Sequence, residues 1–122
     1  MENGLWDLNK MKYSIYNIGG SIVKDNETYV LKDNTELKNM VLSSTELKPR
    51  QSTRGHSHPG QEEVYFFVQG WGSMIVGDES SEPFPVGSGD VILIPDGAFH
   101  KVINTGDQHM LFNCVFDGNR NH

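Results

Sequence analysis

The sequence predicts an all-β fold, a sandwich or barrel built from short strands. The first observation is a series of short segments rich in β-branched and aromatic residues, which favour strands. The second is the turn chemistry between them, where most of the 13 glycines lie. Short strands separated by turn residues at this spacing are typical of sandwiches and barrels. The expected strands are YSIYNI (13–18), ETYVL (27–31), MVLSST (40–45), EVYFFVQ (63–69), SMIV (73–76), DVILIP (90–95), HKVIN (100–104) and HMLFNCVF (109–116).

The turns between these strands are supplied by Gly, Pro, Asn and Asp. In chain order they read NIGGS, HPGQ, VGDESSEP, VGSGD, PDGAF and NTGDQ. Before the first strand, a loosely amphipathic set of apolar residues predicts a short helix, formed by Leu5, Trp6, Leu8 and Met11. We therefore expect residues 1–18 to form an N-terminal arm that packs on the barrel or on a partner subunit.

Size and composition indicate one domain that spans residues 1–122. The net charge of −6 excludes nucleic acid as a general partner, because an acidic surface repels phosphate groups. No apolar run approaches the roughly 20 residues that span a bilayer. The N-terminus lacks the apolar segment of an export signal, and the only cysteine, Cys114, cannot form an internal disulfide. We therefore expect a cytoplasmic protein without a membrane partner.

The stretch HSHPGQEE has the composition of a metal site. Residues two apart on a strand face the same side, so His56 and His58 project together. A Pro-Gly turn then brings an acid back beside them, although strand alternation leaves open whether this acid is Glu62 or Glu63. Imidazole nitrogens and a carboxylate are a common ligand set for divalent first-row metals.

A second stretch, GDVILIPDGAFHKVIN, places another histidine where it can join this site. An apolar strand ends in a Pro-x-Gly turn, and His100 then opens the next strand, from which it can point into the same interior. His109 lies at a turn before the last strand, and we expect it to be exposed instead.

Together the two stretches resemble the paired motifs of the cupin superfamily, within residues 55–104. The first motif reads Gly55-His56-x-His58, four residues, Glu63, six residues and Gly70. The second reads Gly89, five residues, Pro95-x-Gly97, two residues, His100, three residues and Asn104.

This resemblance implies a cupin barrel, which is a double-stranded β-helix or jelly roll, and a small-molecule ligand. It also implies one divalent transition metal (Zn, Fe, Mn, Ni or Co) and chooses Glu63 over Glu62. The metal ligands that it implies are His56, His58, Glu63 and His100. Small cupins pair through sheet faces or exchanged N-terminal strands, so the resemblance further implies a homodimer.

Within the superfamily, the sequence locally resembles the cupin-type phosphoglucose isomerases. The shared features are the entry Thr53-Arg54-Gly55-His56-Ser57-His58, the segment Glu63-Val64-Tyr65 and the NTGD turn that begins at Asn104. The resemblance implies an isomerase-like enzyme for a small sugar or sugar phosphate, whose metal acts as a Lewis acid. Tyr65 and Glu63 would be catalytic. The residues implied for substrate binding are Thr53, Arg54, Gly55, Tyr65 and Asn104.

Two other functions remain open on the sequence. One is a different metal-dependent cupin enzyme, either a dioxygenase or a lyase-type enzyme that acts on a uronate. An oxygenase would be favoured by an apolar lumen wall, at Phe66 or Phe67, Phe99 and Met74. The other is a barrel without catalysis that binds a sugar or a small anion. A sugar would be favoured by a polar and aromatic lumen, at Tyr65, Gln69 and Asn104.

Overall fold

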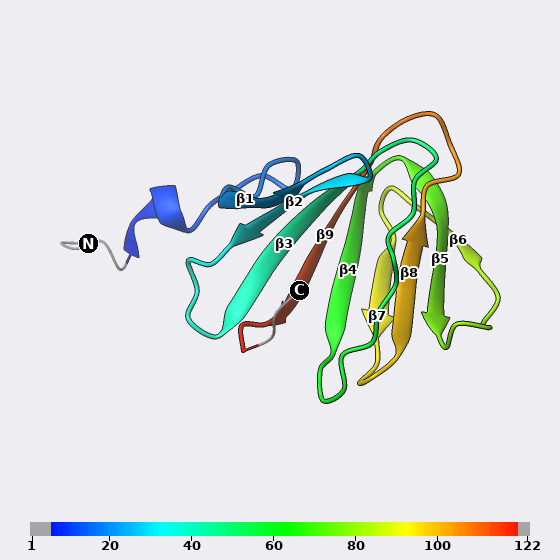
Figure 1. Cartoon of the computed structure of the whole chain (residues 1–122). Coiled ribbons are helices and arrows are strands. Elements are labelled where there is room, and N and C mark those ends of the chain that lie inside the picture. The colour runs from blue at the N-terminus through cyan, green and yellow to red at the C-terminus, as the bar shows by residue number, and fades with distance from the viewer. Residues whose placement is uncertain (1–5, 120–122) are drawn as a thin grey trace.

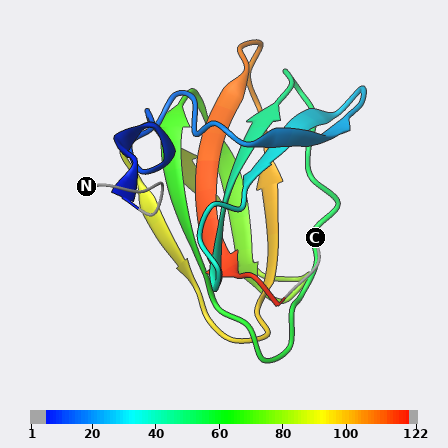
Figure 2. The same cartoon turned by 90° about the vertical axis from the view of Figure 1, so that its left-hand side faces the viewer.

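The computed structural model describes residues 6–119, whose regular structure is almost entirely β (Figures 1 and 2). A short 3₁₀ helix, η2 (Leu8–Lys10), precedes the strands. The strands are β1 (Ser21–Asp25), β2 (Tyr29–Asn34), β3 (Met40–Leu47), β4 (Glu63–Gln69), β5 (Trp71–Gly77), β6 (Phe84–Gly87), β7 (Val91–Ile94), β8 (Phe99–Ile103) and β9 (Met110–Asp117). No α-helix lies within the described residues, which confirms the all-β prediction. None of their helical segments is long and apolar enough to cross a membrane.

The strands pair antiparallel and form two sheets that share one hydrophobic core. The larger sheet has the order β1-β2-β3-β9-β4-β7, and the smaller has the order β6-β5-β8. Figure 1 shows the last strand, β9, between β3 and β4. Met74 and Val102 of the smaller sheet pack in the same core as Phe67 and Phe112 of the larger one. Segments far apart in the sequence therefore meet in one interior.

The register of the larger sheet defines which side chains face that interior. Side chains that pair across neighbouring strands share one face of a sheet. One such row runs from Leu31 on β2 to Thr45 on β3, Phe112 on β9 and Phe67 on β4. All four residues are buried, so this face lines the lumen of the barrel.

The expected strand at 13–18 is wrong, because this segment closes on itself. Ser14 and Asn17 pair with each other across a tight turn. Their side chains accept hydrogen bonds from the backbone amides of Tyr16 and Gly19. Such local bonds occupy backbone groups that a strand would offer to a neighbouring strand.

The described part of the N-terminal arm contains short 3₁₀ segments where the sequence predicts a short helix. Trp6 has 3₁₀ conformation, and η2 begins after Asp7, whose carboxylate accepts a hydrogen bond from a backbone amide. Trp6 and Leu8 are 56% and 69% exposed, so they do not pack on the barrel. Leu5, the first residue of the predicted helix, lies outside the described residues. Ile18, at the end of the arm, is buried.

The sequence does not predict two of the strands, β1 and β6. Both lie at the edge of a sheet. Every residue of β1 is exposed, so β1 has no apolar face that alternation could reveal. Pro85 lies within β6, where the edge position tolerates a residue without an amide proton. In the sequence, Pro85 and Gly87 of β6 look like turn residues and not like residues of a strand.

Candidate metal centre

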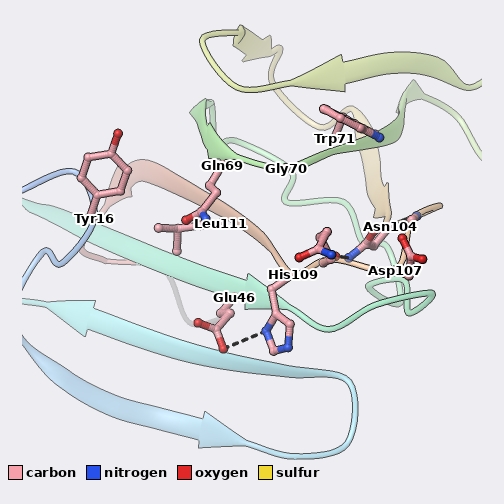
Figure 3. A pocket seen from close by; sticks show the side chains of 11 residues that line it. Tyr16, Glu46, Gln69, Gly70, Trp71, Asn104, Asp107, His109 and Leu111 are labelled. Atoms are coloured by element: carbon pink, nitrogen blue, oxygen red, sulfur yellow. Dashed lines mark hydrogen bonds and ion pairs between the residues drawn. The ribbon is translucent and has the colours of Figure 1, made fainter.

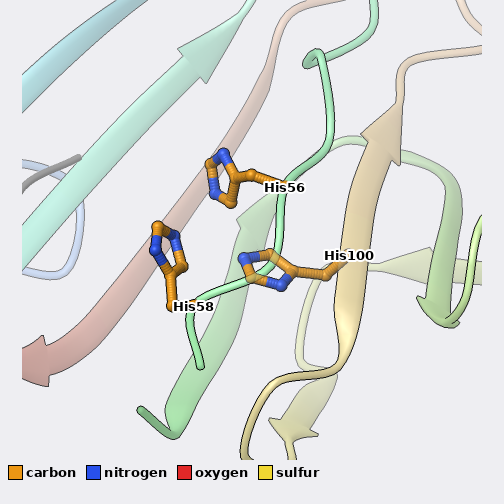
Figure 4. A group of neighbouring side chains, drawn as sticks. All are labelled: His56, His58 and His100. Carbon is orange, nitrogen blue, oxygen red and sulfur yellow. The ribbon is translucent and has the colours of Figure 1, made fainter. Parts of the chain in front are cut away.

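Three histidine side chains from two parts of the chain meet at one point of the barrel (Figure 4). His56 and His58 come from the segment between β3 and β4, and His100 comes from β8. The backbones of His56 and His100 exchange two hydrogen bonds, of 3.1 and 3.0 Å, which hold the segment against β8. One ring nitrogen of each histidine lies within 4.8 Å of those of the other two. At this separation three imidazoles can share one ion.

The acid beside this cluster is Glu63, the first residue of β4. Strand alternation turns Glu63 into the interior, whereas Glu62 is exposed. Glu63 Oε2 lies 2.9 Å from His100 Nε2, and each of the two side chains is only 3% exposed. Of the two acids that alternation left open, Glu63 is therefore the one beside the histidines.

The contact between Glu63 and His100 is favourable only with a cation. His100 Nδ1 lies 3.1 Å from the carbonyl oxygen of Ala98, which can only accept a hydrogen bond, so Nδ1 carries a proton. In a neutral imidazole Nε2 then has a lone pair, and it faces a carboxylate oxygen that is also an acceptor. Two acceptors 2.9 Å apart repel each other unless a proton or a metal ion serves both.

The donor set suits a divalent transition metal. Imidazole nitrogens and carboxylate oxygens bind such ions at about 2.0–2.2 Å, so two ligand atoms at a right angle lie about 3 Å apart. The 2.9 Å between Glu63 and His100 matches this separation. One metal ion can also take the nitrogens of His56 and His58, which a single proton cannot do. A six-coordinate ion with these four ligands would keep open positions for a substrate.

Two residues hold the histidine-bearing loops in place. Gly55 has a φ of +82°, and a Cβ at this position would collide with the ring of Phe99. Only glycine therefore lets the segment lie so close to β8. Asp96, in the turn before β8, accepts a hydrogen bond of 2.7 Å from the backbone amide of Gly60. This bond ties the loop of the first motif to the loop of the second.

The candidate metal centre opens on a cavity of about 310 Å³, to which His56 and Glu63 contribute. Small-molecule sites typically occupy about 300–1,000 Å³. Tyr65 lines the cavity beside the histidines, with its ring 5.8 Å from that of His100 and stacked 5.4 Å from that of Phe112. Hydroxyl groups dominate the polar lining, from Tyr29, Ser43, Thr45, Thr53 and Tyr65.

Residues 43–116, which contain both motifs, match the cupin domain family. This match covers more than half of the chain. The chain belongs to the cupin family. The antiparallel two-sheet barrel is thus the cupin barrel that the paired motifs predict.

Named relatives of this cupin differ in function. Glucose-6-phosphate isomerase of Thermococcus kodakarensis is 26% identical over 106 residues, which cover 79% of this chain and 56% of that protein. An oxalate-binding protein of Thermotoga maritima is 30% identical over 78 residues, which cover 64% of this chain and 62% of that protein. The matched segments therefore cover less than two thirds of the length of either relative.

A solved structure supports the same fold. A protein with a double-stranded β-helix domain from Klebsiella pneumoniae superposes with a TM-score of 0.72 at 18% identity. The superposition covers 87% of this chain and 88% of that chain. At this identity the likeness extends to the fold alone.

Most residues predicted to bind substrate line the cavity, namely Thr53, Arg54, Gly55 and Tyr65. Asn104 does not. Its side-chain amide donates to three backbone carbonyls, and its Oδ1 accepts from the amide of Gly106. Asn104 instead lines a second pocket together with Gln69 (Figure 3). It follows His100 by four residues, a distance of about 13 Å along an extended chain. A substrate role for Asn104 at the histidines therefore has no support in its position.

Sequence reasoning missed four residues around the centre. Lys24 lines the cavity from a strand that the sequence does not predict. Ser43 and Thr45 line it from β3, and the period of two along residues 40–45 could have placed both on one face. Asp96 lies in the PDGAF turn, where an acid is ordinary turn chemistry. No local signal distinguishes its bond to the other loop.

Proposed function

We propose that this cupin is a metal-dependent enzyme that acts on a small sugar or sugar phosphate in an isomerase-like reaction. The observation that carries the proposal is the opening of the candidate metal centre on a cavity lined by hydroxyl groups. A ligand in this cavity would lie against His56, Glu63 and Tyr65 at once. The similarity to the isomerase of T. kodakarensis supports the same reaction class.

The lining of the cavity favours a sugar over an oxygenase substrate. Its hydroxyl groups match the hydroxyl and carbonyl oxygens of a sugar, and its apolar part includes Leu31, Phe112 and Cys114. The apolar wall that an oxygenase would use is dispersed. Phe66 points outward and is 39% exposed, whereas Met74 is fully buried in the core. Neither side chain is part of the cavity lining.

Each residue of the centre would have a defined task. His56, His58, His100 and Glu63 would hold the ion, which as a Lewis acid supplies stabilisation of developing charge on the substrate oxygens. Tyr65 is 7% exposed, so its hydroxyl can exchange a proton with a substrate oxygen away from bulk water. Isomerisation moves protons between neighbouring atoms of one substrate, so the reaction needs no redox partner.

A second candidate is a cupin that binds a small carboxylate without converting it. The observation that favours it is the 30% identity with the oxalate-binding protein of T. maritima. The guanidinium of Arg54 at the cavity is a suitable partner for a carboxylate. This candidate would retain the metal and bind oxalate, yet would release every sugar phosphate unchanged.

Metal analysis and a substrate screen test the proposal. Protein purified without a metal-affinity tag should contain about one divalent transition metal per chain. The metal-loaded protein should then interconvert an aldose and a ketose, with or without phosphate, in a coupled or NMR assay. Metal without any turnover, combined with oxalate binding, would favour the second candidate. Protein that cannot be loaded with any divalent metal would contradict both.

We also propose that the cupin forms a homodimer. An apolar groove joins the N-terminal arm to the outer side of the larger sheet, lined by Met11, Ile15, Phe66 and Val91. Exposed apolar patches of this kind mark interaction surfaces. Light scattering should give twice the chain mass of 13.7 kDa, and removal of residues 1–12 should weaken the association. A monomer at micromolar concentration would contradict the proposal.

A further inference from the structure

The first hairpin contains an irregularity at Val23. Ile22 on β1 pairs with Lys32 on β2. The next pair joins Lys24 to Leu31, so Val23 is left over as an extra residue, which is a β-bulge. Such a bulge shifts the alternation of the residues that follow it.

The bulge places the exposed Lys24 on the side of the hairpin that borders the cavity. In a regular strand, Lys24 would share the face of Ile22, which is 59% exposed on the outside. Instead it shares the face of Leu31, which is buried and lines the cavity. Lys24 is the one residue of β1 that lines this cavity. Bulges next to binding sites commonly re-aim a side chain in this way.

A second cation, Arg54, lines the same cavity from the segment before the histidines. Within residues 6–119, the side chains of Lys24 and Arg54 make no hydrogen bond or ion pair. Nearby lysines differ, since Lys32 Nζ donates to Asn17 Oδ1 at 2.8 Å and Lys48 Nζ donates to a backbone carbonyl at 2.6 Å. The two cations at the cavity are therefore available to a ligand.

The charge balance of the cavity runs against that of the whole chain. The chain carries a net charge of −6, yet the cavity lining holds two cations and one acid, Glu63. Glu63 already lies 2.9 Å from His100. The lining residues therefore carry one more positive than negative charge, which favours an anion near the candidate metal centre.

We propose that Lys24, aimed by the bulge at Val23, and Arg54 bind an anionic group of the substrate, either a carboxylate or a phosphate. The cupin then acts on a sugar acid or a sugar phosphate in preference to a neutral sugar. The sugar part of this inference rests on the proposed function, whereas the anion site itself needs no metal. Both cations donate charge-assisted hydrogen bonds, which are about twice as strong as neutral ones.

Calorimetric titration of the metal-loaded full chain tests the preference for an anion. The probes are glucose, glucose 6-phosphate and glucuronate, which differ in the group at one end. We expect at least one acid to bind about tenfold tighter than glucose, because a hydrogen bond to a charged group is typically worth that much or more. The acid that binds tighter identifies the group as phosphate or carboxylate.

Variants assign that preference to Lys24. Lys24→Ala should reduce the affinity for the acid about tenfold and leave the affinity for glucose and the metal content unchanged. Lys24→Arg should retain the preference. Lys38→Ala is the matched control, because Lys38 is an exposed lysine in the turn between β2 and β3, outside the cavity. The loss should shrink in 1 M salt, where charges are screened within about 3 Å.

A second measurement separates this inference from the proposed function. The metal-free full chain, labelled with ¹⁵N, is titrated with inorganic phosphate and with acetate. One of the two anions should shift the amide signals of β1 in the wild type and not in Lys24→Ala. Anion binding without any sugar binding would leave the anion site in place and overturn the proposed function. An absence of anion-dependent shifts in the wild type, or equal behaviour of Lys24→Ala, would overturn the role of Lys24.

Discussion

The barrel carries two histidine–carboxylate pairs of nearly equal length in two different pockets. His100 Nε2 and Glu63 Oε2 are 2.9 Å apart, and His109 Nδ1 and Glu46 Oε1 are 3.1 Å apart (Figure 3). The side chains of the first pair are each 3% exposed, whereas those of the second are 53% and 49% exposed. His109 is exposed, as its place at a turn predicts. The distance between the partners thus does not distinguish the pairs.

The surroundings of the two pairs distinguish them. Water can solvate both partners of the exposed pair, and such pairs contribute about 0–1 kcal/mol to stability. The buried pair has lost that solvation, which makes an uncompensated charge there expensive. It has instead the imidazoles of His56 and His58 beside it, on a loop shaped by Gly55. Burial and additional ligands, rather than a short contact, therefore mark the candidate functional site.

Removal of an imidazole from the candidate metal centre should have the largest effect. His58→Ala and His100→Ala should lose most of the bound metal and any activity, because each removes one of the four proposed ligands. His109→Ala, which breaks the exposed pair, is the control and should retain both. Metal content is measured by mass spectrometry on protein purified without an affinity tag.

The two acids in the first motif test the same assignment. Glu63→Gln should bind metal much more weakly, and Glu62→Gln should bind it like the wild type, because only the Glu63 carboxylate lies in the interior. Full metal occupancy in His58→Ala would show that the ligand assignment is wrong. Loss of metal in Glu62→Gln but not in Glu63→Gln would show the same.

Acid should empty the buried site. Imidazoles bind a metal only when neutral, and an ordinary histidine has a pKa of about 6.5. Protons should therefore displace the ion as the pH falls below about 6, and binding should be complete above about 7.5. Equilibrium dialysis between pH 5 and 8 measures this transition. His109→Ala should titrate like the wild type, and a transition that depends on His109 would contradict the proposed site.

A comparison of alanine variants at Gly55 and Gly60 separates the cost of backbone strain from the cost of a steric collision. Their φ values are nearly equal, +82° and +83°, but a Cβ would collide with Phe99 only at Gly55. Gly60→Ala should lower the free energy of unfolding by about 1–2 kcal/mol from strain. Gly55→Ala should have the same strain and should lower the free energy of unfolding by about 1–3 kcal/mol more through overpacking. It should also weaken metal binding. Chemical denaturation measures both, and Gly55→Ala/Phe99→Leu should recover most of the difference. Equal destabilisation by the two single variants would contradict the collision.

Loss of the bond between the two loops should have a smaller effect on metal binding. Asp96→Ala removes the acceptor for the Gly60 amide, and it should weaken metal affinity about tenfold, as is typical of residues that position ligands. Asp107→Ala, an exposed acid at the second pocket, is the control. Competition with a chelator measures the affinity. Unchanged affinity in Asp96→Ala would show that the loops hold their positions without this bond.

The exposed pair should respond least. Glu46→Gln should change the free energy of unfolding by no more than about 0.5 kcal/mol, because water replaces the lost partner. Thermal or chemical denaturation at two salt concentrations checks this value. A loss above about 2 kcal/mol would mean that exposure does not separate the two pairs.

The sequence predicts much of the site because its signals are local. His56 and His58 lie close together, as their spacing predicts, but the segment that carries them is a loop with one isolated bridge at His56 and not the strand that alternation would require. The turn chemistry before His100 similarly marks the start of a strand. The same local reasoning is wrong at 13–18, where side-chain hydrogen bonds close a turn, and it does not find the edge strand β1.

The sequence by itself determined the all-β class, the cupin motifs and the residues from which a metal site could be built. Only the tertiary structure decided which side chains reach the lumen. The Val23 bulge places the exposed Lys24 at the cavity, and it exists only because β1 pairs with β2. Asn104 is taken up by backbone carbonyls that lie as far as 57 positions away in sequence. The physical reason is that alternation and turns depend on neighbouring residues, whereas register and burial depend on strands that meet only in the folded chain.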